Sequence, residues 1–76
     1  MTNGKNGFSM SGFTPREKRV AMLLSYGKSR SEIAKDLGIS ENTVKTHAQS
    51  IFRKSRVNSQ KEFMALFYKM NKDSEE

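Results

Sequence analysis

The chain has 76 residues, 34% of them hydrophobic, and no cysteine, so it is limited to one small core without disulfides or zinc–thiolate sites. The net charge is +6, and the surplus lies between Arg16 and Glu62, where eleven lysines and arginines stand against five acidic residues. No hydrophobic run suits a membrane span or signal peptide, so we expect a cytoplasmic protein. The basic charge indicates that it binds a polyanion or simply carries solvated lysines. We do not expect an enzyme in a chain of this size.

The two ends of the chain are polar segments with too few apolar residues to join a core. Residues 1–12 are rich in glycine, asparagine and serine, with Phe8 and Met10 as apolar exceptions, and residues 71–76 are wholly polar. We expect a flexible arm or linker at the start and a frayed tail at the end. One folded domain is therefore predicted for residues 13–70.

The first predicted helix covers about Pro15 to Tyr26. Thr14 supplies an N-cap hydroxyl, Pro15 suits the first helical position, and Glu17 stands where a capping box needs a carboxylate. Gly27 follows as the residue best able to take the left-handed conformation that ends a helix. The apolar positions at helical spacing are Val20, Leu23 and Leu24.

Two further helical patterns are separated only by Gly38 and Ile39. Ser29 and Glu32 form a second capping box ahead of a short apolar stripe, and Ser40 is a suitable N-cap for a longer helix from Glu41 to about Lys54. Helices joined by so tight a turn must cross steeply, which predicts a helix-turn-helix with Ile39 filling the angle between them.

The longer of these helices has two different faces. Its apolar stripe consists of Val44, Ala48, Ile51 and Phe52. The opposite face carries side chains that can bond base edges or phosphates, with no acidic residue among them: Asn42, Lys45, Thr46, Gln49 and Arg53. This face suits a nucleic-acid groove, and the plainer alternative is an ordinary solvated face.

The last predicted helix begins with a third capping box, Ser59 to Glu62, and has more apolar residues than one face can bury. Its core stripe is Phe63, Leu66, Phe67 and Met70. Because Met64 and Tyr68 lie at the flank, we expect a second buried surface, a dimer interface formed by Met64, Phe67 and Tyr68. The alternative is that these side chains wrap around the core.

Several separated motifs together resemble the LuxR/GerE-type helix-turn-helix. They are Phe13-Thr14-Pro15-Arg16-Glu17, Gly27-Lys28-Ser29, Glu32-Ile33-Ala34, Leu37-Gly38-Ile39-Ser40 and Thr43-Val44-Lys45-Thr46-His47. They agree with the family in order and spacing, and the resemblance covers about Phe13 to Met70.

The resemblance implies an all-α, four-helix domain that binds duplex DNA and regulates transcription, with the second and third helices as the motif. Base contacts in the major groove are implied for Lys45, Thr46 and Gln49. Contacts with the phosphate backbone are implied for Ser29, Asn42, Thr43, His47 and Arg53. The fourth helix is implied to pair with its counterpart in a homodimer. RNA polymerase is a further candidate partner, and a bacterial domain of this kind is expected on the nucleoid when bound to DNA.

The chain also departs from the family pattern. Where the family usually has Leu-Gly-Val followed by an Asn-Arg pair, this chain has Ser55-Arg56-Val57-Asn58-Ser59-Gln60. The missing leucine is expected to weaken the packing between the third and fourth helices. Gln49 replaces a usual basic residue, so base preference cannot be transferred from a relative. The motif also resembles the fourth region of sigma factors as far as Phe52, although the capped fourth helix favours the LuxR/GerE interpretation.

No residue set suggests catalysis or a cofactor. His47 is the single histidine and has no cysteine or carboxylate cluster beside it, so we expect it near a phosphate or partly inside the fold rather than on a metal. The glutamates Glu17, Glu32 and Glu62 have capping roles that explain them. A helical protein-interaction module that does not bind DNA remains the alternative from another functional class.

Overall fold

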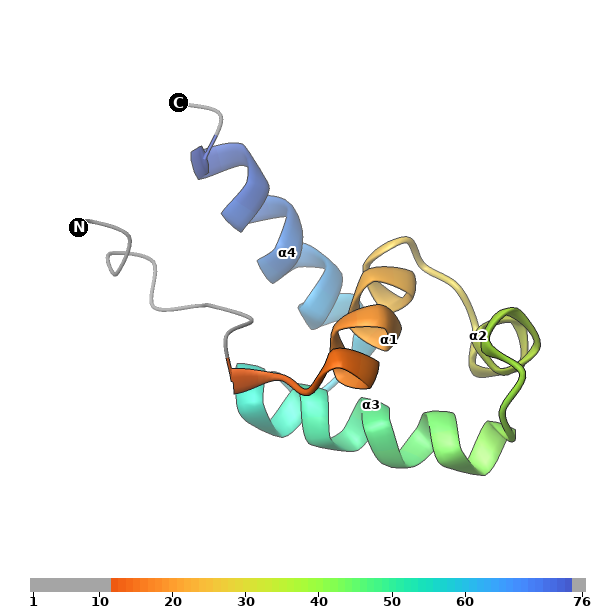
Figure 1. The fold of residues 1–76 in the computed structure, drawn as a ribbon. Coiled ribbons are helices and arrows are strands. Elements are labelled where there is room, and N and C mark those ends of the chain that lie inside the picture. The colour runs from red at the N-terminus through yellow and green to blue at the C-terminus, as the bar shows by residue number, and fades with distance from the viewer. Residues whose placement is uncertain (1–11, 75–76) are drawn as a thin grey trace.

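The computed structural model describes residues 12–74, with side chains as far as Lys69, and contains four helices and no strand in that range (Figure 1). The helices are α1 Pro15–Ser25, α2 Arg30–Leu37, α3 Glu41–Ser55 and α4 Gln60–Ser74. The all-α, four-helix prediction is therefore confirmed. The arm predicted for residues 1–12 lies outside the described residues apart from Gly12, as does the side chain of Met70.

Three helices begin at the caps that the sequence predicts. In α1 the Thr14 hydroxyl accepts the Glu17 amide at 3.1 Å, and the Glu17 carboxylate accepts the Thr14 amide at 2.9 Å. Ser29 and Glu32 repeat both bonds at the start of α2. The Ser40 hydroxyl accepts the Thr43 amide at 3.0 Å and so caps α3. Local sequence thus determines where these helices start.

The prediction of a complete third capping box is wrong. The Ser59 hydroxyl does accept the Glu62 amide at 3.2 Å, but the Glu62 carboxylate accepts the amide of Asn58, at 2.7 Å, instead of that of Ser59. The return bond is shifted by one residue towards the N-terminus, and it connects the loop before α4 to the first turn of α4. Pairing of this kind depends on the path of the loop, which a four-residue motif does not encode.

The other helix ends differ slightly from expectation. α1 ends at Ser25, one residue early, and Gly27 has a φ of +86°, the left-handed conformation expected of it. α4 continues to Ser74, so the segment predicted as a frayed tail is helical over residues 71–74. Nothing there breaks a helix, because neither glycine nor proline occurs after Met70.

All four helices contribute to one apolar core. The largest side chains that are fully buried are Val20 from α1, Ile33 from α2, Val44 and Ile51 from α3, and Phe63 from α4. The Phe63 ring lies 6.0 Å from that of Phe52 and 5.8 Å from that of Phe67, distances at which aromatic rings attract one another. Ile39 packs against this core from the turn between α2 and α3, as predicted. The core therefore fixes how the helix-turn-helix sits on α1 and α4.

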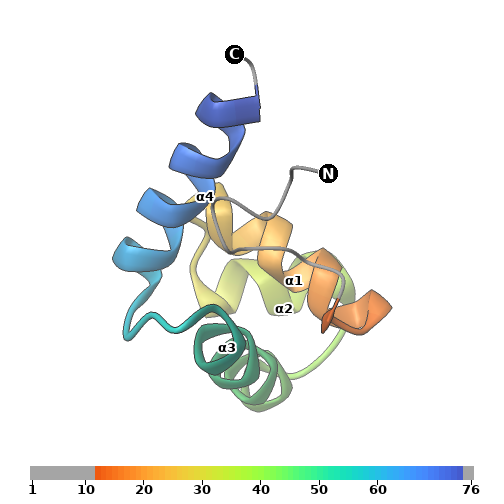
Figure 2. The same ribbon diagram turned by 90° about the vertical axis from the view of Figure 1, so that its left-hand side faces the viewer.

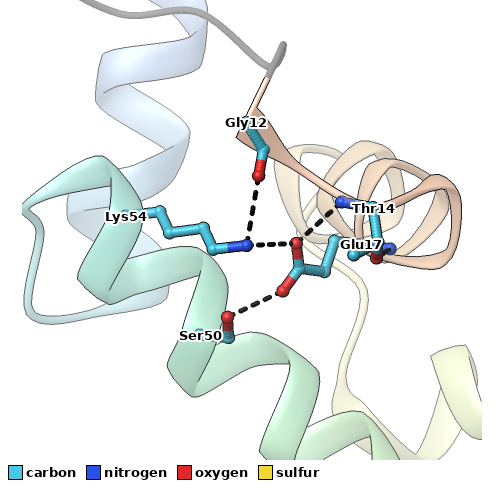
Figure 3. Close-up of polar contacts among 5 residues, drawn as sticks. All are labelled: Gly12, Thr14, Glu17, Ser50 and Lys54. Carbon is cyan, nitrogen blue, oxygen red and sulfur yellow. Dashed lines mark hydrogen bonds and ion pairs between the residues drawn. The ribbon is translucent and has the colours of Figure 1, made fainter.

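A buried carboxylate connects α1 to α3 (Figure 3). Glu17 is 5% exposed; its Oε2 accepts the Ser50 hydroxyl at 2.7 Å, and its Oε1 accepts the Lys54 ammonium at 2.8 Å. Lys54 also donates to the Gly12 carbonyl at 3.1 Å and lies 5.9 Å from the centre of the Phe13 ring. The residue that caps α1 thus also fixes α3 in place.

The junction between α3 and α4 has two unusual features, of which the sequence predicted only the first. Ser55, at the position of the family's usual leucine, is buried, and its hydroxyl has no hydrogen-bond partner among the described residues. Arg56, at the position of the family's glycine, caps α3 with a φ of +60°. The helix ends as a glycine-capped helix would, but on a residue that carries a Cβ.

Candidate nucleic-acid interface

α3 lies along one edge of the molecule, and the other three helices cover only its inner side (Figures 1 and 2). Val44, Ala48 and Ile51 of the predicted apolar stripe are buried, Phe52 is partly buried, and Ser55 is buried although it was not part of the stripe. The predicted groove-facing residues are all exposed: Asn42, Lys45, Thr46, Gln49 and Arg53. The structure therefore brings these five side chains together on one uncovered face.

The electrostatics of this face favour an anionic partner. From Asn42 to Arg53 the helix has no acidic residue, and neither Lys45 nor Arg53 forms an ion pair within residues 12–69. Lys54 differs from both because it is bound to Glu17. The unpaired cations of α3 are thus the ones that point away from the core.

The hydroxyl of Thr46 already uses its single hydrogen-bond donor inside α3. Its proton is donated to the Asn42 carbonyl one turn earlier, at 3.1 Å. What remains towards solvent is an acceptor oxygen and a methyl group. These suit an exocyclic amine of adenine or cytosine, or the methyl group of thymine.

The residues implied as contacts with the DNA phosphate backbone differ in their exposure and in the hydrogen bonds that they already make. Ser29 and Thr43 are exposed at the first turns of α2 and α3, although the Ser29 oxygen already caps α2 and the Thr43 oxygen lies 2.8 Å from that of Ser40. His47 is half-buried, the partly inside position expected for it. The Ser29 oxygen acts as the acceptor in the cap, and its hydroxyl donates no hydrogen bond within residues 12–69.

The structure adds two residues that the sequence did not single out. Arg30, at the start of α2, and Gln60, at the start of α4, line a hollow of about 220 Å³ together with Lys45 and Gln49 of α3. In the sequence Arg30 is one of the eleven basic residues between Arg16 and Glu62, with nothing to distinguish it. Its place in the same hollow as Lys45 depends on how α2 crosses α3, which the sequence of neither helix predicts. Gln60 was noted only as a departure from the family pattern.

A second surface lies between α1 and α4, away from the exposed face of α3. A hollow of about 210 Å³ there is lined by Ser25, Tyr26, Met64, Phe67 and Tyr68. Tyr26 and Tyr68 are about two-thirds exposed, whereas Phe67 belongs to the core. We call this the tyrosine surface; it contains the three residues predicted for a dimer interface.

Other kinds of site find no support in the part of the chain that the structure describes. Residues 12–69 contain no group of histidine, cysteine, aspartate or glutamate side chains that could hold a metal ion. None of the described helices is long and apolar enough to cross a membrane.

Comparison with known proteins identifies the family. The model of the bacterial regulatory proteins of the luxR family matches residues 11–67, three quarters of the chain. The chain belongs to this family. Its helix-turn-helix is accordingly a DNA-binding motif of transcription regulation, which confirms the resemblance seen in the sequence and the expectation that the domain is not an enzyme.

Curated relatives agree with this assignment. The CsgBAC operon transcriptional regulatory protein of Escherichia coli is 52% identical over 44 residues, 58% of this chain and 20% of the relative. The nitrate/nitrite response regulator protein homolog of Haemophilus influenzae is 36% identical over 63 residues, 83% of this chain and 30% of the relative. The chain spans less than a third of either relative. No solved structure matches it significantly.

Proposed function

We propose that this domain binds a specific duplex DNA site as a homodimer, with α3 in the major groove, and that it thereby directs a transcription regulator to its operator. The observation that carries this proposal is the exposed, acid-free face of α3 with its unpaired cations. A helix with side chains is about 10–12 Å across, and the major groove of B-DNA is about 12 Å wide, so a helix uncovered on one side can enter it.

Lys45, Thr46 and Gln49 are the proposed base contacts. A lysine ammonium suits the O6 and N7 acceptors of guanine, and a glutamine amide suits the N6 and N7 groups of adenine. Thr46 offers its acceptor oxygen and its methyl group, as described above. These three side chains lie within about one turn of α3, so they would contact neighbouring base pairs.

The backbone contacts fix the register of α3 without determining sequence. Asn42, Thr43, His47 and Arg53 lie along α3, and Ser29 approaches from the start of α2. The Ser29 oxygen accepts the Glu32 amide at 3.1 Å in the cap of α2, so its hydroxyl proton can still be donated to a phosphate. Phosphate oxygens are the natural acceptors for such donors.

We assign the tyrosine surface to a second copy of the chain. It combines two largely exposed tyrosines with a hollow at the junction of α1 and α4, and aromatic side chains of this kind are enriched at protein interfaces. Two-fold pairing there would relate the two α3 helices by the same axis. RNA polymerase is the further partner we propose, because the relatives are named as transcriptional regulators.

Selection of bound sequences from a random duplex pool tests the function and supplies the site. With that site in hand, Lys45→Ala and Gln49→Ala should each weaken specific binding by about 1–3 kcal/mol while hardly changing binding to random duplex. Lys69→Ala, which removes an exposed charge on α4, is the matched control and should leave both affinities close to wild type.

Two results would contradict the proposal. Equal losses on specific and random DNA would reduce Lys45 and Gln49 to backbone contacts. A folded domain that bound no duplex at low salt would leave the protein-interaction module as the better assignment, with the tyrosine surface as its binding face.

A further inference from the structure

The hollow beside α3 has a defined shape and composition. One wall is a strip along α3 formed by Lys45, Ala48, Gln49 and Phe52, which are spaced so that they share one flank over two turns. The opposite wall comes from the other three helices, with one residue from each: Leu24, Arg30 and Gln60. The hollow thus lies between one flank of α3 and the other three helices, and we call it the trough.

The chemistry of the hollow suits an anion with an apolar part. Arg30 and Lys45 are its two cations, no acidic side chain lines it, and neither cation has an ion-pair partner within residues 12–69. Because Lys45 is proposed to contact a base, Arg30 is the cation left for a phosphate. The apolar side chains between them are Leu24, Ala48 and Phe52. A sugar-phosphate unit has this combination, because its deoxyribose is largely C–H surface and its phosphate carries the charge.

The position of the hollow points to the same ligand. A helix of about 10–12 Å fills a major groove of about 12 Å, so the sugar-phosphate strands that border the groove pass along the flanks of the helix. The trough occupies one of those flanks over two turns of α3. A volume of about 220 Å³ exceeds by several times the roughly 30 Å³ that one water takes up in the liquid, which leaves room for a phosphate group and its waters.

We infer that this trough seats one sugar-phosphate unit of the bound DNA and that Arg30 is a phosphate contact from α2, facing α3 across the trough. The inference rests on the proposed major-groove binding of α3 and adds a contact that neither the motif residues nor the cap of α2 supply. A guanidinium presents a fork of N–H groups that matches two phosphate oxygens.

Gln60 is a positioning residue for this contact. Its Nε2 donates to the Leu24 carbonyl at 3.0 Å and to the Lys28 carbonyl at 2.9 Å, which uses both amide hydrogens. The first bond holds the end of α1, and the second holds the loop one residue before the cap of α2. α4 thereby fixes the backbone that leads into Arg30, so the guanidinium is placed before DNA arrives.

The test is a comparison of Arg30→Ala with wild type on the selected site and on random duplex over a salt series. Loss of one phosphate contact should reduce the slope of log affinity against log salt by about 0.9. The ratio of wild-type to variant affinity should then shrink roughly threefold between about 50 and 200 mM salt, equally on both DNAs. Lys69→Ala should leave the slope unchanged.

A methylphosphonate scan locates the contact. Neutralising one phosphate at a time should reveal a position that weakens the wild type but not Arg30→Ala, because the variant has already lost that interaction. Gln60→Ala should reduce this position-specific effect without changing the number of charges. Arg30→Lys should retain the salt slope and lose part of the affinity, since an ammonium keeps the charge without the fork.

The outcomes separate this inference from the proposed function. If the wild type binds the site and loses specificity with Lys45→Ala, but Arg30→Ala keeps the full slope or the scan shows additive losses at every phosphate, the trough holds no phosphate. If the wild type binds no duplex at all, both proposals are overturned. Circular dichroism of Arg30→Ala should match the wild type, because Arg30 is exposed and contributes nothing to the core.

Discussion

Glu17 accepts hydrogen bonds from the Thr14 amide, the Ser50 hydroxyl and the Lys54 ammonium. The bond from Lys54 does most to lower its pKa, followed by those from Ser50 and Thr14, and together they outweigh burial and bring the pKa from 4.5 to about 2. The capping motif predicts only the contact with Thr14. The other two partners lie 33 and 37 residues away, so local sequence could not indicate them.

The lowered pKa predicts a definite pH dependence of stability. Between about pH 4.5 and 2 the unfolded chain binds a proton at Glu17 that the folded chain does not, so its contribution is complete above that window and is lost as the pH falls through it. Glu17→Gln should lower the free energy of unfolding near neutral pH by about 1–3 kcal/mol. Urea unfolding followed by circular dichroism should show the variant and wild type converging in acid.

Glu32→Gln is the matched control for that prediction. Glu32 closes the same capping box at the start of α2, but it is exposed, and within residues 12–69 its carboxylate bonds only to Ser29. It should cost less than Glu17→Gln and leave most of the acid dependence in place. Equal losses in the two variants would show that the connection to α3 adds nothing to the cap.

Two helix ends adopt the same left-handed backbone with different residues. Gly38 has a φ of +69° with open space where a Cβ would stand, and Arg56 has a φ of +60°. A Cβ makes this conformation unfavourable by about 1–2 kcal/mol. A glycine would recover only part of this free energy, because it also makes the unfolded chain more flexible. We therefore expect Arg56→Gly to raise the free energy of unfolding by about 0.5–1 kcal/mol.

Two companion variants isolate the backbone effect. Gly38→Ala should lower stability by about 1 kcal/mol, and Arg56→Ala, which removes the charge and keeps the Cβ, should show no gain. Thermal unfolding resolves such changes, since about 1 kcal/mol moves the Tm of a domain this small by roughly 4–8 °C. A gain in Arg56→Ala equal to that in Arg56→Gly would assign the effect to charge instead of backbone.

At the scale of elements, α3 meets two requirements with one periodic pattern. Its apolar stripe packs against the core, and the residues between face outward, so both the burial and the exposed face were predictable from spacing alone. The flank that forms the trough was not. Arg30 and Gln60 reach that flank only through the crossing of α2 over α3 and the return of α4, which no single helix encodes.

The packing of α3 against α4 should improve when its buried hydroxyl is removed. The Ser55 hydroxyl is buried without a partner in the described part of the chain, and alanine is also the better helix former, so Ser55→Ala should stabilise the domain by about 1 kcal/mol. Ser50→Ala makes the same chemical change five residues earlier, where the hydroxyl donates to Glu17, and should destabilise by a similar amount. If Ser55→Ala lowers the urea midpoint as Ser50→Ala does, the Ser55 hydroxyl forms a stabilising hydrogen bond and the prediction is wrong.

For the whole molecule, the order of the helices and the helix-turn-helix followed from caps and apolar periodicity, because both are local. The wrong predictions concern the two ends of α4, where the path of the preceding loop determines the cap and the absence of a helix-breaking residue determines the length. The Asn58 amide took the bond expected for Ser59, and α4 continued past Met70 through polar residues. The position of Phe67 shows a related limit: spacing placed it both in the core stripe and in the interface, and the structure buries it in the core.

The proposed pairing of two copies through the tyrosine surface can be tested with single substitutions on that surface. Met64 is the less suitable probe of it, because its methyl group lies against Gly27, within 3.4 Å of where a Cβ there would stand, and a charge at Met64 would disturb the contact of α4 with α1. Tyr68 is 67% exposed on the same surface, so its replacement changes the surface more than the core. Tyr68 therefore allows assembly to be tested separately from folding.

We predict that Tyr68→Lys makes the domain monomeric and removes cooperative binding to the full site, with affinity for a half-site retained. If two copies pair through the tyrosine surface, their α3 helices are related by a two-fold axis, and the selected DNA should be an inverted repeat with half-sites about one helical turn apart. Tyr68→Phe keeps the apolar ring and should still dimerise, whereas Met22→Lys, which places the same charge on an exposed part of α1 outside the tyrosine surface, should behave as wild type. Sedimentation and titration on full and half sites measure all three. A Tyr68→Lys variant that still sedimented as a dimer and bound the full site cooperatively would move the interface elsewhere, and a selected site without two-fold symmetry would contradict the two-fold arrangement itself.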